Sequence, residues 1–200
     1  DNWAASSGGV ADGGGPPTAL QSARFDANGL GNCTVDAVDP TIAGLLLNGY
    51  TGTIDLNGNT VTATGTVTLT SGTINDTPGT DSLVVNATGT TTFNGTTFGA
   101  IVHTTSRSVA LSGSTFNARS TFIKNGTGNI TGTGGNIYNG DVYLTHSGAN
   151  NFILANTNPD DFNGSLIITN SGTGTIYLSY TATGNTYDGN IIINSTGTNS

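Results

Sequence analysis

The feature that most constrains the fold is an aromatic–Asn–Gly turn that recurs through the second half of the chain. Its aromatic residues follow one another at nearly constant intervals of about two dozen residues, and they are Phe93, Phe116, Tyr138, Phe162 and Tyr187. A second series keeps the same spacing, at Gly126, Gly148, Gly172 and Gly197. A unit of about 22–25 residues cannot bury its own apolar face and must stack on its neighbours. The repeat therefore predicts a solenoid.

Alternating apolar residues indicate that the repeats are built from β-strands. Val142 and Leu144 recur as Leu166 and Ile168, and a second strand of the repeat contains Phe152 and Leu154. This period of two is typical of strands with one buried face. The 31 glycines and the absence of Glu leave few helix formers. We expect an all-β chain, folded as a parallel and right-handed β-helix with three short strands in each turn.

Stacking in register would align equivalent residues of successive turns. The aromatic residues Phe93, Phe116, Tyr138, Phe162 and Tyr187 are expected to form one stack. The residues that follow them are expected to form a ladder at the adjoining corner: Asn94, Asn117, Asn139, Asn163 and Asp188. Asn and Gly tolerate the left-handed backbone conformation that corners require.

An antiparallel sandwich is the alternative fold. Asn-Gly pairs between apolar runs, such as Asn57-Gly58 and Asn125-Gly126, are also hairpin signals. A sandwich does not repeat its sequence every two dozen residues, so the repeat favours the solenoid.

The repeat is not uniform along the chain, which divides it into two parts. Residues 1–33 lack the period and contain Gly13-Gly14-Gly15-Pro16-Pro17, so we expect an irregular N-terminal cap over the open end of the solenoid. Residues 34–200 are expected to form the turns, with the clearest repeat over residues 93–200. No cap is recognisable at the C-terminal side, where the solenoid is expected to continue or to stay uncapped.

Composition excludes several classes of function. The formal net charge is −8 with only four basic residues, which argues against nucleic-acid binding. The longest apolar run, Ile42 to Leu47, is too short to cross a bilayer, so we expect no membrane span. The single cysteine, Cys33, rules out an internal disulfide framework and is expected to be a small buried residue.

No residue pattern indicates an enzyme, and we expect none. The acidic residues are spread along the chain, and the one adjacent pair, Asp160-Asp161, follows Pro159 and is typical of a turn. His103 and His146 lie far apart in the sequence, at predicted strand ends of different turns, where a surface or strand-terminal position is expected. No nucleophile–base arrangement accompanies them.

Calcium is the one cofactor that the sequence leaves open. Asp55, Asn57 and Asn59 alternate like the start of a calcium-binding loop, but Thr60 and Thr66 stand where such a loop needs Gly and Glu. Asp160 and Asp161, with the nearby asparagines, are the second candidate group. An ordinary turn is the simpler interpretation of both.

Threonine and aromatic residues define further binding hypotheses. Thr60, Thr62, Thr64, Thr66, Thr68 and Thr70 alternate, so several of them should share a face, and flat threonine rows can bind ice. Beyond Thr97 that pattern ends. A carbohydrate-binding or carbohydrate-cleaving β-helix would need exposed aromatic residues on one face or a carboxylate cluster across turns, and the sequence shows neither.

The order of several motifs resembles the opening of very large, adhesin-like surface proteins of Gram-negative bacteria, including gliding ones. The motifs are Asn2-Trp3, Ser7-Gly8-Gly9, Pro17-Thr18-Ala19, Ala23-Arg24-Phe25-Asp26-Ala27-Asn28, Asn32-Cys33-Thr34-Val35-Asp36 and Gly49-Tyr50-Thr51-Gly52-Thr53-Ile54. Ser171-Gly172-Thr173-Gly174-Thr175-Ile176-Tyr177 and Phe162-Asn163-Gly164 resemble the repeats of such proteins. The resemblance implies export to the cell surface, a β-helical stalk and adhesion. It also makes Ser82, after Asp81, a candidate for O-glycosylation.

These observations lead to one expected function and two alternatives. The first is a secreted or cell-surface structural and adhesive protein, in which the solenoid is a stiff stalk or fibre segment. The second is an extracellular filament whose subunits join end to end by strand addition. The third is the carbohydrate-binding or ice-binding β-helix. The expected partners are further repeats or copies of the same chain and, for an adhesin, surface glycans.

Overall fold

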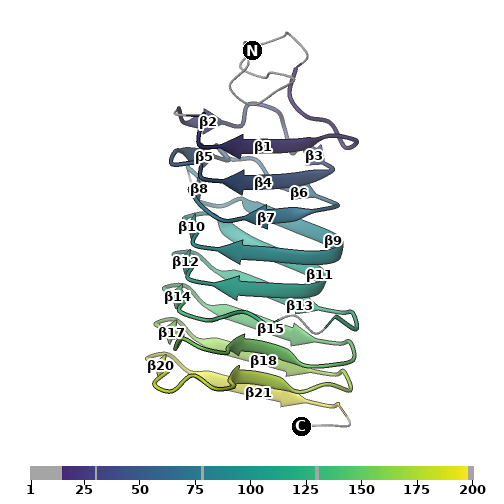
Figure 1. The fold of residues 1–200 in the computed structure, drawn as a ribbon, viewed down its shortest axis with the longest axis vertical. Coiled ribbons are helices and arrows are strands. Elements are labelled where there is room, and N and C mark those ends of the chain that lie inside the picture. The colour runs from purple at the N-terminus through teal and green to yellow at the C-terminus, as the bar shows by residue number, and fades with distance from the viewer. Residues whose placement is uncertain (1–14, 30, 78, 129–130, 198–200) are drawn as a thin grey trace.

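The chain coils into a solenoid of parallel strands with no helix among the residues that the structure describes. The structure is a computed structural model and describes residues 15–29, 31–77, 79–128 and 131–197. About eight turns follow one another along the long axis, and the chain runs from one end of the coil to the other (Figure 1). The predicted all-β parallel β-helix is therefore confirmed, and the antiparallel sandwich is excluded because every strand pair is parallel.

Each turn contributes strands to three faces. Face 1 consists of β3 (Thr41–Ile42), β6 (Val61–Ala63), the first halves of β9 (Ser82–Asn94) and β11 (Ile101–Ser112), β13 (Ser120–Lys124), β15 (Val142–His146), β18 (Leu166–Asn170) and β21 (Ile191–Ser195). Face 2 consists of β1 (Ser22–Asp26), β4 (Gly44–Asn48), β7 (Val67–Leu69), the second halves of β9 and β11, β16 (Phe152–Ala155) and β19 (Ile176–Ser179).

Face 3 is the narrowest and consists of strands of two or three residues. They are β2 (Cys33–Thr34), β5 (Thr53–Asp55), β8 (Thr73–Asn75), β10 (Thr97–Phe98), β12 (Thr115–Phe116), β14 (Ile137–Tyr138), β17 (Asp161–Phe162) and β20 (Thr186–Tyr187). In Figure 1 the near-side strands β1, β4 and β7 of face 2 point left, and the chain returns behind them as it descends. The coil is therefore right-handed, as expected for parallel crossovers.

Turn length varies more than the sequence repeat indicates. One turn, which runs from Phe98 to Phe116 on face 3, is clearly shorter than the turns before and after it. Thr96 and Ser114, which are hydrogen-bonded across this turn, have a sequence separation of only 18. The predicted range of turn lengths is therefore too narrow, because the corners absorb insertions and deletions while the strands keep their register.

The core is a column of inward side chains along each face. Within β13, β15 and β18 the buried residues alternate with half-buried ones, which confirms the period of two. Along face 3 the inward residues of successive turns change from aliphatic to aromatic: Cys33, Ile54, Ile74, Phe98, Phe116, Tyr138, Phe162 and Tyr187. Burial of these columns between stacked turns stabilises units that could not fold alone.

Face 1 has a regular outward surface. Its outward side chains form two columns, one through Thr62, Val84, His103, Thr121, Tyr143, Ile167 and Ile192, the other through Asn86, Thr105, Ile123, Thr145, Thr169 and Asn194.

The solenoid begins earlier than the sequence indicates. β1 pairs in parallel with β4 from Ser22 to Asp26, and β2 pairs with β5 from Cys33. Ser22–Asp26 and Cys33 are therefore part of the stack, and the predicted cap boundary at residue 33 is wrong. The sequence pattern did not reveal this turn, because it lacks the aromatic–Asn–Gly motif that marks the later turns. Residues 1–14 of the predicted cap, with Trp3 and the motifs around it, lie outside the described residues.

Two columns of glycine allow the backbones of successive turns to approach at corners. A Cβ atom on Gly164 would lie 2.5 Å from the carbonyl carbon and oxygen of Gly140, and one on Gly189 would lie 2.5 Å from the Gly164 oxygen. The second column contains Gly126, Gly148, Gly172 and Gly197, where a Cβ on Gly148 would lie 2.4 Å from the Gly126 oxygen. The spacing of the glycine markers thus reflects a steric requirement.

The described part of the chain contains no helix long and apolar enough to cross a membrane.

Candidate functional site

The aromatic stack lies inside face 3, and one of its predicted members is different. Consecutive ring centroids of Phe98, Phe116, Tyr138, Phe162 and Tyr187 lie 4.7–5.2 Å apart, with the planes within 13° of parallel. Phe93 is not in this column. It lies on face 2 opposite Leu69 and Leu111, and its ring meets that of Phe98 edge to face at 5.1 Å.

The reason for this difference is that the aromatic–Asn–Gly motif occupies two different corners. At Phe93-Asn94-Gly95 it follows a face 2 strand, and Gly95 has a φ of 75° at the corner before face 3. From Phe116 onward the motif follows a face 3 strand. Asn94 accordingly pairs with Ser112 and is outside the predicted ladder.

The asparagine ladder runs along the exposed edge that follows face 3. The Asn139 Nδ2 atom donates to Asn117 Oδ1 at 2.8 Å, and Asn163 Nδ2 donates to Asn139 Oδ1 at 2.8 Å. Asp188 follows Tyr187 at the same corner, where its backbone N–H donates to the Phe162 carbonyl. Gly99 occupies the ladder position that was predicted for Asn94. In the preceding turn the equivalent residue is Asn75.

A second polar ladder, which the sequence analysis missed, lies inside the corner before face 3. Its side chains are buried and come from successive turns: Thr96, Ser114, Asn136 and Asp160, with Asn185 below them. The backbone N–H of Ser114 donates to Asn136 Oδ1 at 3.1 Å, that of Asn136 to Asp160 Oδ1 at 2.8 Å, and that of Asp160 to Asn185 Oδ1 at 2.9 Å. The side chains of Ser114, Asn136, Asp160 and Asn185 thus each accept an inward N–H group that no strand can pair, while the Thr96 hydroxyl donates to the Ser71 carbonyl.

Asp160 is the only carboxylate in this inner ladder. Burial raises its pKa from 3.8 to about 6, although the backbone and side-chain N–H groups of Asn136 act in the opposite direction. Its Oδ2 atom and the hydroxyl of Tyr138 are both buried without a hydrogen-bond partner among the described residues. Burial, together with the nearby Asp160 charge, raises the pKa of Tyr138 well above its ordinary value.

A third ladder, inside the corner between faces 1 and 2, contains the most unusual side chains. Lys124, His146 and Asn170 are in register on β13, β15 and β18, and all three are buried. The Lys124 ammonium donates to the carbonyls of Gly126 and Ala149 at 3.0 Å, and lies 3.4 Å from His146 Nε2. His146 Nδ1 lies 3.2 Å from Asn170 Oδ1, so the Nδ1–H tautomer satisfies both ring nitrogens.

This basic ladder has three acceptors for the three N–H bonds of the ammonium but no carboxylate. Burial lowers the pKa of Lys124. Burial and the Lys124 charge lower the pKa of His146, while its bond to Asn170 raises it. Both groups are sealed inside the coil, with Lys124 1% and His146 0% exposed, so no substrate can reach them.

The calcium candidates are engaged in ways that do not form a common ligand shell. Asp55 Oδ1 accepts from the backbone N–H groups of Asn57 and Thr77, while the amides of Asn57 and Asn59 both donate to the Val35 carbonyl. Asp160 points inward, whereas Asp161 points outward and accepts from Thr186. Asp160 and Asp161 therefore face opposite sides of the chain, as adjacent residues of an extended segment do.

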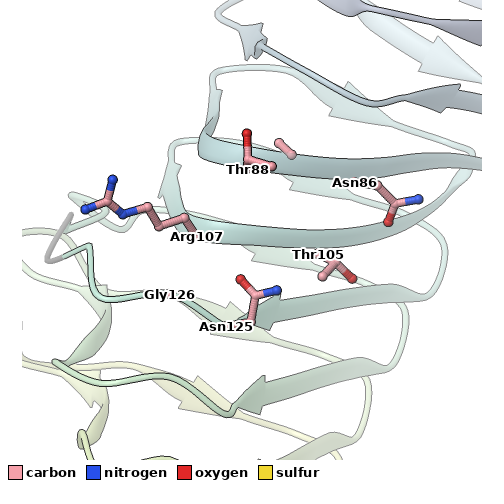
Figure 2. Close-up of a pocket in the computed structure, with 7 residues that line it drawn as sticks. Asn86, Thr88, Thr105, Arg107, Asn125 and Gly126 are labelled. Atoms are coloured by element: carbon pink, nitrogen blue, oxygen red, sulfur yellow. The ribbon is translucent and has the colours of Figure 1, made fainter.

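The described surface contains a shallow open hollow of about 430 Å³ where β9 and β11 bend from face 1 to face 2. Figure 2 shows Asn86, Thr88, Thr105 and Asn125 around it, with Arg107 extending away from the strands. The aliphatic stem of Arg107 lies against Gly126, where a Cβ would come within 2.3 Å of Arg107 Cγ. No aromatic ring lines the hollow, so it lacks the stacking surface that sugar rings need.

The remaining predicted residues are dispersed. Thr62 belongs to face 1 and Thr68 to face 2, so the threonine run from Thr60 to Thr70 bends around a corner and does not share a face. His103 is half-buried on the outward side of face 1, and Ser82 begins β9 in a half-buried outward position. Cys33 is free and only half-buried, not fully buried as expected.

Both inner ladders had a recognisable sequence signal. Ser114, Asn136, Asp160 and Asn185 each stand two residues before a stacked aromatic residue. Lys124, His146 and Asn170 continue the alternation of inward residues in their strands and recur with the same spacing as the strands themselves. Polar residues at inward positions of a repeat therefore indicate buried ladders.

Comparisons of the chain with protein-family models, with curated proteins and with solved structures found no match.

Proposed function

We propose that this chain is a structural and adhesive segment of a secreted or cell-surface protein, in which the solenoid acts as a stiff spacer. The observation that carries this proposal is the in-register stacking of successive turns throughout the described residues between Ser22 and Ser195. Backbone ladders run along the coil axis, and the corners are tied by side-chain ladders that link one turn to the next. Such a coil resists bending because bending would break many bonds together.

The positions of the titratable groups support a non-enzymatic role. The most buried groups with a raised or lowered pKa are Tyr138, His146, Lys124 and Asp160, and all four face the interior. A catalytic group has to reach its substrate as well as have a shifted pKa. These residues serve to close the corners of the coil.

The charge distribution supports a role that does not depend on ion pairs. Among the described residues one ion pair is present, between Arg24 and Asp26 at 3.8 Å on the first strand. Backbone and amide ladders keep their strength as ionic strength changes, unlike exposed ion pairs. The low charge and the Thr, Asn and Gly content suit an extracellular fibre, and the expected export rests on the resemblance to adhesin-like proteins.

The spacer function is tested by measuring stiffness. Magnetic-tweezers or force-microscopy extension of the chain held at both ends should show no gradual lengthening before an abrupt unfolding event. Gradual lengthening at low force would contradict the spacer. Adhesion is tested separately, by binding to an array of surface glycans and to uncoated surfaces. Absence of binding to all of them would contradict the adhesive function and leave the spacer function in place.

An end-to-end filament is the second candidate. The last described turn presents the edge of β21 and exposes Ile191 at 45% and Ile193 at 65%. A strand added to this edge, from another copy or from a further turn, would cover both side chains. Negative-stain electron microscopy separates the outcomes: rods of one repeating length joined at their ends support the filament, and isolated short rods exclude it.

A further inference from the structure

One column of threonines crosses the outward surface of face 3 in consecutive turns. Its members are the residues that begin β5, β8, β10 and β12, which are Thr53, Thr73, Thr97 and Thr115. Each pairs in register with the next, so the four side chains lie one below another. At the outward strand positions of faces 1 and 2, no more than two threonines follow one another among the described residues. We call these four residues the threonine column.

The hydroxyls of the threonine column are directed to the outside of the coil and are not needed to close it. No hydrogen bond within the described part of the chain uses them, whereas the hydroxyls of Thr64, Thr70 and Thr96 donate to carbonyls of the preceding turn. The backbone N–H groups of Thr73 and Thr115 donate to the turn above, so the strands themselves are satisfied. A partner in front of face 3 therefore meets hydroxyl and methyl groups that have no competing internal bond.

The interior behind the threonine column keeps the column straight and rigid. The rings of Phe98 and Phe116, which follow two of the threonines, stack at 4.8 Å with their planes 3° apart. Ile54 and Ile74 fill the same inward column in the two turns above and are buried. Threonine is β-branched, which restricts its χ1 angle in a strand. The hydroxyls are thus held at fixed positions before any partner arrives, which lowers the entropic cost of binding.

A row of amides runs beside the threonine column. Asn75 and Asn117 stand two residues after Thr73 and Thr115 and lie on the same outward side. Strand geometry spaces successive turns by about 4.8 Å and outward residues of one strand by about 6.7 Å. Both spacings are similar to the repeats of the water oxygens on a prism plane of ice. The two rows therefore form a two-dimensional array that a crystalline lattice of water can match.

The chemistry of this array disfavours other partners. The only carboxylate on its four strands is Asp55, whose Oδ1 atom accepts from the backbone N–H groups of Asn57 and Thr77. An ionic ligand would find no counter-charge on the threonine column. The aromatic rings behind it are buried, so a sugar ring would find nothing on which to stack.

We propose that the threonine column and its row of amides form an ice-binding surface. The hydroxyls and amides hydrogen-bond water molecules at ice-like positions, and the methyl groups between them fill the spaces of the lattice. Binding depends on the match over all four turns, because each single contact is weak. The array ends below β12, where Ile137 and then Asp161 occupy the column. The proposal does not depend on the spacer function, which needs only the stacking of turns.

The experiment measures thermal hysteresis of the whole chain, which is the gap between the melting and freezing temperatures of a single ice crystal in its solution. A gap that grows with protein concentration and a faceted crystal are expected. Thr97→Lys places a long hydrated charge within the column and should abolish both. Thr121→Lys is the matched control, because Thr121 is an outward, half-buried threonine on face 1, and it should leave the gap unchanged.

A second pair of variants tests the column by a gain of activity. Ile137→Thr adds a threonine in register with Thr115 and should widen the gap. Ile167→Thr is its control, because it adds an isolated threonine on face 1 between Tyr143 and Ile192.

Circular dichroism verifies that each variant is folded, and Thr73→Lys replaces Thr97→Lys if the latter unfolds. The proposal is overturned by round crystals with no gap in the wild type, by equal losses in Thr97→Lys and Thr121→Lys, or by a gap that Ile137→Thr does not widen.

Discussion

The buried carboxyl of Asp160 shows how a single residue can oppose the stability of an otherwise neutral ladder. Its neighbours in the inner ladder are amides and hydroxyls. Of these, Asn136 donates its backbone and side-chain N–H groups to Asp160 Oδ1 and needs only an acceptor oxygen at that position. An Asn would supply that oxygen and could also donate toward the buried Tyr138 hydroxyl. The charge of Asp160 is thus not needed for the ladder, and its pKa of about 6 reflects the cost of burying it.

This cost predicts a specific pH dependence. Because the pKa of Asp160 is raised by folding, its contribution is fully present below the unfolded value of 3.8 and is lost as pH rises through about 6. Asp160→Asn should remove this loss and raise the free energy of unfolding at pH 7.5 by up to about 3 kcal/mol. Urea unfolding measured from about pH 4 to about pH 7.5, which spans the two pKa values, checks this.

Two comparisons keep that test specific. Asp161→Asn, on the outward neighbour, should leave the pH slope of the wild type in place. Asp76 acts in the opposite direction: burial alone would raise its pKa, but backbone N–H donors from Asp81, Gly58, Thr80 and Gly79 lower it. Its contribution is lost only as pH falls below 3.8, outside the tested window. An unchanged slope in Asp160→Asn would show that the carboxyl is not the cause.

At the scale of the elements, the inner ladder through Asn136 and the exposed asparagine ladder through Asn139 should contribute differently to the free energy of unfolding, because the first is buried and the second is exposed. Asn136→Ala leaves the buried N–H of Ser114 without an acceptor and removes a donor from Asp160, so a loss of about 2–4 kcal/mol is expected. Asn139→Ala breaks two bonds that water can replace and should cost about 1 kcal/mol or less. Thermal unfolding of both variants measures the difference, and equal losses would contradict it.

The glycine columns lead to a second prediction for the elements. A Cβ on Gly164 would meet the backbone of Gly140 at 2.5 Å, and backbone atoms cannot move aside without shifting the turn above. Gly164→Ala should therefore destabilise the protein by about 2–4 kcal/mol. Gly89→Ala is the control, since nothing lies within 4 Å of a Cβ there. Chemical denaturation compares the two variants, and a neutral Gly164→Ala would mean that the corner can relax.

For the whole molecule, stacking makes each turn depend mainly on its two neighbours. Deleting residues 163–187 removes one complete turn and joins Phe162 to Asp188, which keeps β21 in register with β15. We expect this deletion to preserve cooperative unfolding, with amide-exchange protection retained in β13 and β15. Deleting residues 163–174 removes only half a turn and should strip protection from the turns that follow. Similar loss in both deletions would argue against stacking as a one-dimensional array.

The sequence by itself determined that the chain is a solenoid of parallel strands. The evenly spaced aromatic residues and glycines, such as Phe162 and Gly164, repeat too often for any other way of burying their apolar faces. Alternation within each strand then decided which residues face inward, as at Val142 and Leu144. These conclusions depend on local patterns, which the chain carries in every repeat.

Only the tertiary structure decided which corner each marker occupies. Phe93 and Phe116 both precede an asparagine, yet one ends a face 2 strand and the other a face 3 strand. Their spacing resembles the repeat only because the turn between Phe98 and Phe116 is short. The inward position of Asp160 beside Tyr138 and the burial of Lys124 against two carbonyls depend on the same register. Differences in turn length are accommodated at the corners, where the sequence constrains the backbone least. Which residues share a column therefore cannot be predicted until the register of the stacked turns is known.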